Sequence, residues 1–426
     1  MSADVRAGYK QTEVGVIPED WTVRSISQVS RKIMDYRGRT PRKLGLNWGD
    51  GDIPALSAGN VRLGYIDFEQ ECYLASEELH RRWMVHGDVE KNDIVFTTEA
   101  PLGNVALIPD NRKYVLSQRT VLFQCGEETT HSPFLYQVLM SDSFQQILRD
   151  HSSGSTAQGI KRKVLETLLI VSPPLPEQRA IATALSDVDA LLSGLDSLIA
   201  KKQNLKQAAM QQLLTGQTRL PGFSGEWEVK AMKSLGQTYG GLASKTKEDF
   251  GHGSSKYIPF MNVMKDTVID PDWLESVDVA SSEAQNLVKK GDLFFNGSSE
   301  TPKEVGFCSV LLAEIPNLYL NSFSFGFRFN SDAKVSGLFF AYWFRGADGR
   351  TVMSVLAQGA TRHNIGKSAF MRLSIPQPTQ EEQTAIATVL SDMDTELAAL
   401  QARRDKTRAL KQAMMQELLT GRIRLI

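Results

Sequence analysis

The sequence predicts an α+β protein in which two globular domains alternate with two long helices. Three observations lead to this fold class. One helical segment occurs twice, the segment before each copy carries the short apolar runs typical of strands, and Pro- and Gly-containing turns separate the two kinds of segment. The order of these segments predicts an internal repeat with pseudo-two-fold, circular character.

The helical repeat is the clearest pattern in the chain. Residues 177–220 return as residues 382–425, and the copies match without a gap at about 25 of roughly 44 positions. Apolar residues recur at alternating spacings of four and three, which is typical of a coiled-coil seam. The predicted seam residues are Ile181, Leu185, Val188, Leu192, Leu195 and Ile199 in the first copy, and Ile386, Leu390, Met393, Leu397 and Leu400 in the second.

The second seam is interrupted at Arg404 and is expected to resume at Leu410, Met414 and Leu418. Two helices with nearly identical apolar faces bury those faces most economically against each other, and the alternative is that each helix packs on its own domain. Both predicted helices follow prolines and end at Thr-Gly, as helices commonly do. At about 1.5 Å per residue, such helices are roughly 55 to 60 Å long and suited to act as spacers.

The remaining segments are predicted to be α+β domains. The β-branched and aromatic runs 94–98, 114–125 and 318–329 predict strands, whereas 133–150 and 337–346 predict helices. The aromatic clusters around Phe323 to Phe329 and Phe339 to Phe344 are expected in the core, because large aromatic side chains dominate cores.

The two domains are also predicted to be distant copies of each other. Trp21 aligns with Trp227 at a shift near 205, and Ile53-Pro54 aligns with Ile258-Pro259 at the same shift. The ends of the chain match in circular order, so we expect the termini to lie close together. The predicted boundaries are an N-terminal segment at 1–21 that closes the ring, a first domain at 22–175, a spacer helix at 176–221, a second domain at 222–375 and a second helical region at 376–426.

Composition limits the class of protein. The 426 residues are 42% hydrophobic with a formal net charge of -1, and no apolar stretch approaches the length that spans a membrane. Three scattered cysteines, Cys72, Cys125 and Cys308, fit packing roles in a reducing cytoplasm. The near-neutral charge disfavours a protein that binds nucleic acid alone, but it allows a few local basic loops to read bases beside a partner protein.

Several motifs together resemble one family. The opening residues 9–21 (YKQTEVGVIPEDW), the junction 174–182 (PLPEQRAIA) and the LLTG-x-x-RL endings at 213–220 and 418–425 resemble the specificity (S) subunit of type I restriction-modification systems. The resemblance covers essentially the whole chain, and its strength lies in the ordered arrangement of these motifs.

The resemblance implies a non-catalytic subunit with two target recognition domains. Each domain would read one half of a split, asymmetric sequence in double-stranded DNA, and an antiparallel helix pair would set the unspecified spacer. Two modification (M) subunits would carry S-adenosylmethionine and methylate adenine, and restriction (R) subunits would use ATP and Mg. This chain would bind no cofactor and would be cytoplasmic without membrane contact.

The residues agree with an absence of catalysis by this chain. The sequence has no Asn-Pro-Pro-Tyr/Phe motif and no Gly-x-Gly-x-x-Gly motif opening a βαβ unit, and its six histidines lack metal-ligand spacing. The alternative function is a coiled-coil adaptor that does not bind DNA and carries two peptide-binding modules.

Three sets of polar residues are candidates for DNA contact, because cations bind phosphate or guanine and short polar side chains meet base edges. Basic loops supply the first set, the loops before the long helices supply the second, and residues that follow equivalent strands supply the third. For each residue, the alternative is a solvated or turn-forming role. The sets are Arg37, Arg39, Arg42, Lys43, Lys245, Lys247 and Lys256; Gln158, Lys161, Lys163, Arg362, His363 and Lys367; and Thr97, Thr98, Asn296 and Ser298.

Overall fold

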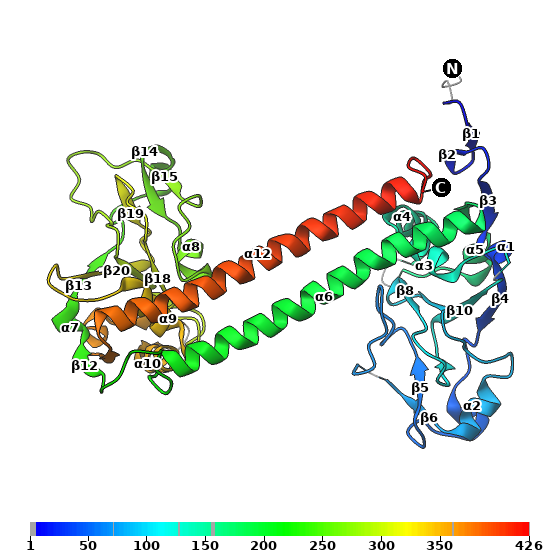
Figure 1. The fold of residues 1–426 in the computed structure, drawn as a ribbon, viewed down its shortest axis with the longest axis horizontal. Helices are drawn as coiled ribbons and strands as arrows, with labels where there is room; N and C mark the ends of the chain where they lie inside the picture. Colours follow the sequence, from blue (N-terminus) through cyan, green and yellow to red (C-terminus); the bar gives the residue numbers. More distant parts are fainter. Residues whose placement is uncertain (1–5, 71, 127, 155–157, 360–361, 426) are drawn as a thin grey trace. The chain divides into compact units, whose positions relative to one another are not determined.

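The chain folds into two compact units. The structure, a computed structural model, describes residues 6–70, 72–126, 128–154, 158–359 and 362–425. One unit contains Met1–Leu195 with Arg403–Ile426, and the other contains Asp196–Ala402. Each unit therefore holds one globular domain and parts of both long helices (Figure 1).

A four-stranded antiparallel sheet forms the centre of the first domain. Its strands lie in the order β4 (Ser30–Asp35), β10 (Thr120–Cys125), β7 (Ile94–Thr98) and β8 (Leu102–Leu107). Successive side chains of a strand point to opposite faces, so Ile94 and Phe96 enter one hydrophobic core and Val95 enters another. Because both faces are covered, β7 reads as a continuous run of buried residues.

Different elements cover the two faces of this sheet. On one side lie a small sheet of β6 (Leu74–Ala75), β5 (Ile53–Leu56) and β9 (Val115–Leu116), and helix α2 (Glu77–Trp83). On the other side lie α3 (Ser132–Met140) and α4 (Asp142–Asp150). Ser141 separates these two helices because its hydroxyl caps α4 by accepting a hydrogen bond from the Phe144 amide at 3.3 Å. The single helix predicted over 133–150 is thus two helices.

The second domain repeats this architecture. Its main sheet has the order β13 (Gly236–Gly240), β20 (Ser324–Phe329), β16 (Leu293–Asn296) and β18 (Cys308–Val310), with the same antiparallel pairing. A smaller sheet of β15 (Glu275–Val277), β14 (Phe250–Ile258) and β19 (Leu318–Leu320) corresponds to β6, β5 and β9. The shared strand order confirms that the domains are distant copies.

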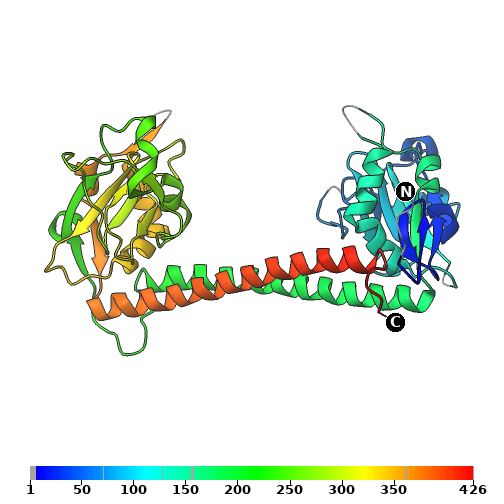
Figure 2. The same cartoon turned by 90° about the horizontal axis from the view of Figure 1, so that it is seen from above.

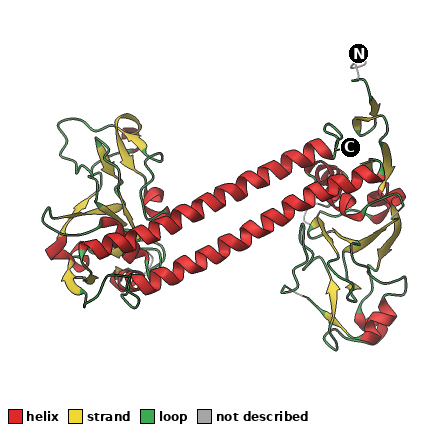
Figure 3. Cartoon of the chain, in the orientation of Figure 1, coloured by secondary structure: helices red, strands yellow, loops and turns green. Residues whose placement is uncertain are grey.

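The remaining elements complete the two domains (Figure 3). In the first unit they are β1 (Tyr9–Thr12), β2 (Gly15–Pro18), β3 (Thr22–Ser25), α1 (Ile26–Val29), η1 (Pro41–Leu44), α5 (Arg162–Thr167) and β11 (Leu169–Ser172). In the second unit they are β12 (Glu228–Ala231), α7 (Met232–Leu235), η2 (Lys247–Asp249), α8 (Phe260–Lys265), β17 (Ser298–Ser299), α9 (Gly337–Arg345), α10 (Ala347–Leu356), β21 (Ala357–Gln358), β22 (His363–Ile365), α11 (Lys367–Phe370) and β23 (Ser374–Gln377).

The two long helices, α6 (Leu175–Leu213) and α12 (Gln380–Leu418), pack against each other and run antiparallel. In the second unit, Lys202 of α6 forms an ion pair with Glu396 at 2.7 Å, and Lys206 pairs with Asp394. The partner number on α12 falls as the number on α6 rises, which defines the antiparallel direction. Lys411 and Asp189, 2.7 Å apart, continue this pairing within the first unit.

The buried face of the helices follows the predicted seam in its central part. Leu195, Ile199 and Leu397 are buried, and the other seam residues of the central turns are partly buried. The prediction for Leu410 is wrong, because this side chain is 55% exposed. The alternating spacing continues from Arg404 through Thr407 to Lys411, and those residues occupy the inner face instead.

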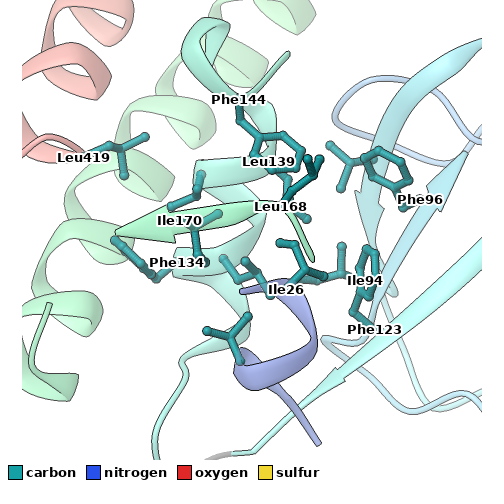
Figure 4. Close-up of a cluster of buried hydrophobic side chains, with 14 of the residues drawn as sticks. Ile26, Ile94, Phe96, Phe123, Phe134, Leu139, Phe144, Leu168, Ile170 and Leu419 are labelled. Carbon is teal, nitrogen blue, oxygen red and sulfur yellow. The ribbon is translucent and has the colours of Figure 1, made fainter. Parts of the chain in front are cut away.

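The ends of the helices belong to the domain cores. Ile181 and Leu185 lie in the core of the first domain together with Leu418, the last residue of α12, and with Leu419. Figure 4 shows part of this core, with Leu419 labelled. In the same way, the second core contains residues from the start of α12 and the end of α6. Both predicted alternatives therefore apply: the helices pair with each other along their length and pack on a domain at their ends.

A buried carboxylate anchors the start of each long helix. Glu177 of α6 is fully buried, and its Oε2 accepts a hydrogen bond from Trp21 Nε1 at 2.9 Å and from Arg424 Nη2 at 2.7 Å. Glu382 of α12 does the same with Trp227 Nε1 at 3.2 Å and with Arg219. We call these sets the first anchor (Trp21, Glu177, Arg424) and the second anchor (Trp227, Glu382, Arg219).

The glutamine after each anchor carboxylate joins the helix to its own domain. Gln178 accepts a hydrogen bond from the His131 amide at 2.9 Å, and Gln383 accepts one from the Ser336 amide at 2.8 Å. These amides lie at the start of α3 and α9, which are equivalent helices. The repeated Glu-Gln pair therefore fixes each long helix on the same part of each domain.

The N-terminal and C-terminal segments lie against one another. Tyr9 Oη donates a hydrogen bond to the Gly421 carbonyl at 2.9 Å, and Arg424 Nη2 contacts Asp20 Oδ2 at 2.8 Å. Figure 2 shows the first strands and the tail after α12 beside the same domain. This is the proximity that the matching ends of the sequence predict, and it holds for the described residues of both segments.

Candidate nucleic-acid interface

Three loops leave the first domain at one end of its main sheet. Strand β4 ends at Asp35 and β7 ends at Thr98, whereas β10 begins at Thr120. The antiparallel register places Asp35 opposite Val121 and Thr97 opposite Thr120, so these strand ends lie together. We call this end of the sheet the loop end.

The segment before α5 joins the same loop end. Gly159 forms bridges with both Glu99 and Ser153, which tie this segment to the turn after β7. The candidates Arg37 to Lys43, Thr97 and Thr98, and Gln158 to Lys163 lie in separate stretches of the sequence. The structure brings these stretches to one end of the domain.

The second domain has an equivalent loop end. Ser298 of β17 pairs with Asn364 of β22, and Gln358 of β21 pairs with the same residue. These pairings correspond to the bridges that Glu99 and Ser153 make with Gly159 in the first domain. The long loop that begins after Gly240 leaves from the same end, because Gly240 pairs with Phe325 near the start of β20.

The four cations of the first basic loop differ in their availability. Arg37 is held by Asp35 at 2.7 Å, and this carboxylate raises the pKa of the guanidinium. Arg39 donates to the Trp83 carbonyl at 2.7 Å, and Lys43 donates to the Gly38 carbonyl at 2.6 Å. Arg42 is exposed and forms no ion pair with any residue in the described ranges, which leaves its charge available to a ligand.

A cavity of about 700 Å³ opens beside this loop. Arg39, Arg42 and Arg119 line it together with Trp48 and Tyr73. The Trp48 and Tyr73 rings stack with their centroids 5.7 Å apart, so the cavity combines cations with an aromatic wall. Phosphates, base edges and base faces all find suitable partners in such a lining.

The candidates that follow equivalent strands are mostly engaged inside the protein. Thr97 and Thr98 are buried, and their hydroxyls donate to the carbonyls of Asn104 and Arg119. Asn296 is also buried, and its side chain donates to the Glu304 carbonyl at 2.9 Å and accepts from the Phe307 amide at 2.6 Å. Ser298 is partly exposed, and its hydroxyl accepts from Arg362 Nε at 3.1 Å.

The basic residues of the second domain also divide into engaged and available groups. The Lys245 side chain is 7% exposed and forms an ion pair with Glu283 at 2.6 Å. Lys256 donates to the Ser276 hydroxyl at 2.8 Å, whereas Lys247 is exposed. His363 is partly buried. The remaining candidates of both domains are exposed, namely Gln158, Lys161, Lys163, Arg362 and Lys367.

Sequence reasoning missed two residues at the loop ends, Arg119 and Phe323. The Phe323 side chain is 59% exposed, so the prediction that the whole cluster 323–329 lies in the core is wrong at this one position, whereas Phe325 and Phe327 are buried. Both missed residues stand directly before an equivalent strand, β10 or β20. Aligning those two strands, at a shift of 204, would have paired them.

No group of three or more His, Cys, Asp and Glu residues within the described ranges is arranged to hold a metal ion. None of the helices in the described part of the chain is long and apolar enough to cross a bilayer.

Comparison with known proteins identifies the family. The family model for the type I restriction modification DNA specificity domain matches residues 18–206 and again residues 224–407. The chain therefore belongs to the type I restriction-modification specificity subunits. The repeated match coincides with the repeated architecture, one domain and one long helix in each copy.

Individual relatives extend over nearly the whole chain. The chain is 24% identical over 434 residues to the putative type I restriction enzyme MjaX specificity subunit of Methanocaldococcus jannaschii, covering 98% of this chain and 96% of that protein. It is 24% identical over 427 residues to the MjaVIII specificity subunit of the same organism, covering 96% and 94%. The fold is similar to the crystal structure of the S subunit from M. genitalium, with a TM-score of 0.57, 16% identity and coverage of 93% and 96%.

Proposed function

We propose that this chain is the sequence-reading subunit of a type I restriction-modification enzyme and that it recognises a bipartite, asymmetric target in double-stranded DNA. Each globular domain reads one half-site, and the paired helices determine the length of the unspecified spacer. The chain docks two M subunits and, for restriction, R subunits. Adenine methylation with S-adenosylmethionine takes place in M, and ATP and Mg serve R, so this chain selects the target without catalysing its modification.

The convergence of candidate residues at one loop end of each domain carries this proposal. Residue types that are able to bind phosphate or base edges gather there from separate loops, and the two domains share one scaffold but present different side chains. Two related surfaces with different chemistry suit two different half-sites. The near-neutral net charge is consistent with a complex in which partner subunits make many of the phosphate contacts.

The proposal is tested by sequencing the methylome of a host that expresses this chain with its M partner. We expect methylated adenines within a two-part motif interrupted by a spacer of fixed length. If the chain and its M partner are purified from the host as a complex but the methylome contains no such motif, the proposal is contradicted. The adaptor alternative predicts that outcome.

The spacer role has a separate test. Four residues, about one helical turn, are inserted in α6 between Leu195 and Leu205. We expect the unspecified spacer to lengthen while both half-site sequences stay the same. The companion variant carries a second insertion of equal length in α12 at 395–405. This second insertion preserves the antiparallel pairing, in which Lys202 contacts Glu396 and Lys206 contacts Asp394. Altered half-site sequences would show that the helices do more than set distance.

A further inference from the structure

We infer that Phe323 contacts a base in the half-site read by the second domain, and that Arg119 occupies the same position in the first domain. This inference rests on the proposed function, since it names specificity-determining residues for DNA recognition. It assigns an apolar contact to one half-site and a charged contact to the other.

The backbone establishes that the two positions are equivalent. The Arg119 carbonyl accepts a hydrogen bond at 2.8 Å from the amide of Thr98, the last residue of β7 in the first domain. The Phe323 carbonyl accepts a hydrogen bond at 2.9 Å from the amide of Gly297, which directly follows β16 in the second domain. Each residue therefore stands at the same place on the loop end of its sheet.

A rigid turn presents the exposed Phe323 ring to solvent. The Asn321 side chain is buried, and its Oδ1 accepts a hydrogen bond from the Phe323 amide at 3.0 Å while its Nδ2 donates to the Ile258 carbonyl at 3.1 Å. Because both its amide and its carbonyl are hydrogen-bonded, the backbone of Phe323 is held in this turn, which sets the direction of its Cα–Cβ bond. Leaving 59% of a phenylalanine side chain in water forfeits the free energy of burial, which suits a residue that a partner covers.

The chemistry around Phe323 suits DNA more than an apolar peptide. The Arg362 guanidinium lies over the ring at 6.0 Å from its centroid, and it also donates to the Ser298 hydroxyl. The ring of Phe260 packs edge-on against Phe323 with the centroids 6.5 Å apart. An exposed aromatic ring next to a cation matches a base flanked by its phosphate, since bases accept aromatic or apolar contacts and phosphates accept guanidinium.

The equivalent position in the first domain has opposite chemistry on the same scaffold. Arg119 lies 3.0 Å from Glu99, and both side chains are about half exposed. Glu99 occupies the place of Ser298, because each pairs with the matching residue of the neighbouring segment, Gly159 or Asn364. One position of the scaffold therefore carries an ion pair in one domain and an aromatic ring in the other, as expected where the domains read different bases.

The test compares Phe323→Ala with the wild-type chain, each expressed with the M partner. We expect the methylome motif of Phe323→Ala to lose discrimination in one half-site only, and affinity for a duplex carrying the wild-type motif to fall about 10- to 100-fold. Arg119→Ala should relax only the other half-site. Val229→Ala is the matched control, because Val229 is 68% exposed in the same unit but lies on β12, which pairs with β23 rather than belonging to the loop end.

The outcomes separate this inference from the proposed function. Phe323→Ala would overturn the assignment of Phe323 if it methylated the wild-type motif and bound the same duplex with an affinity within about twofold of the wild-type affinity. That result would leave the proposed function intact. A wild-type complex without any bipartite motif would overturn both. Phe323→Leu guards against misfolding: it keeps an apolar contact, so we expect it to retain more affinity than Phe323→Ala at an unchanged melting temperature, and equal losses in both variants would contradict an apolar base contact.

Discussion

Arg424 contacts Glu177 across 247 positions of the sequence, with Arg424 Nη2 at 2.7 Å from Glu177 Oε2. The carboxylate is fully buried, and the guanidinium also lies over the Trp21 ring at 5.7 Å from its centroid. Arg219 and Glu382 repeat this contact in the other unit. The last residues of the chain are therefore part of the structure that holds the start of α6.

We expect Arg424→Ala to lower the free energy of unfolding by about 2 to 3 kcal/mol, since it leaves a buried carboxylate without its cation. Urea denaturation of the full chain measures the change, and a double-mutant cycle with Glu177→Gln isolates the contact. Arg422→Ala is the control, because Arg422 is exposed and pairs with Glu417 at 3.5 Å, so its loss should cost well under about 1 kcal/mol. Equal effects of the two substitutions would contradict the anchoring role.

The seam between the helices predicts a contrast between neighbouring residues. Ile199 is 5% exposed and faces α12, whereas Leu198 is 39% exposed on the outer face of α6. Ile199→Ala should therefore destabilise the chain by about 2 to 3 kcal/mol through loss of buried surface, and Leu198→Ala should cost less than about 1 kcal/mol. The contrast is tested by thermal unfolding of both variants, monitored by circular dichroism at 222 nm. A larger loss of stability in Leu198→Ala than in Ile199→Ala would contradict it.

A pH-dependent stability is expected from Asp93. Burial raises the pKa of this carboxyl to about 6, although the Glu90 amide and Gln124 donate to it at 2.7 and 2.8 Å. A carboxyl whose pKa is higher in the folded than in the unfolded chain favours folding in its neutral form. Its favourable contribution is therefore complete below about pH 4 and is lost as the pH rises through 6.

Asp93→Asn removes this loss, so we expect the variant to be more stable than the wild type at pH 7.5, by about 1 to 2 kcal/mol, and nearly equal to it at pH 4. Melting temperatures at the two pH values test this expectation. Asp292 is the equivalent residue of the second domain, but Arg328 contacts it at 2.6 Å. Asp292→Asn should therefore destabilise the protein at pH 7.5, and a stabilising effect there would refute the reasoning for both sites.

Arg42 and Arg39 should respond differently to substitution by alanine. We expect Arg42→Ala to weaken DNA binding by the complex and to reduce the slope of log affinity against log salt by about 1, with stability unchanged. Arg39→Ala should instead lower the melting temperature, because Arg39 holds the Trp83 carbonyl and lies over the Tyr36 ring. Titration of labelled duplex at several salt concentrations tests the first expectation, and an unchanged salt slope for Arg42→Ala would refute it.

The sequence was most informative where the signal is local. The long helices and strand β7 follow from spacing and composition, since neighbouring residues decide them. The two-copy architecture follows from the match between residues 177–220 and 382–425. Ser141 was missed because its capping role depends on the direction in which the chain leaves α3. Leu410 was predicted to lie on the inner face because it is apolar and only one position from Lys411, the residue that does lie there. Where the seam is irregular, spacing alone does not separate these two positions.

The candidate interface was harder to predict because it depends on contacts between distant segments. The loops at this end of the first domain meet only through the register of β10 with β4 and β7 and through the bridges of Gly159. Whether a cation is available also depends on a distant partner, as the pairing of Lys245 with Glu283 shows. The exposure of Phe323 is set by the turn at Asn321. The amino acids of this turn resemble those of the neighbouring core strand β20, so the sequence does not distinguish the two.

The two anchors bear on how this chain arose. Arg219 lies near the end of the first copy of the helical repeat and pairs with Glu382 of the second copy, while Arg424 lies near the end of the second copy and pairs with Glu177 of the first. Each copy thus lends its tail to the helix start of the other. Such reciprocal exchange is how a half-length ancestor would assemble as a symmetric dimer, and gene fusion would have left both anchors in place.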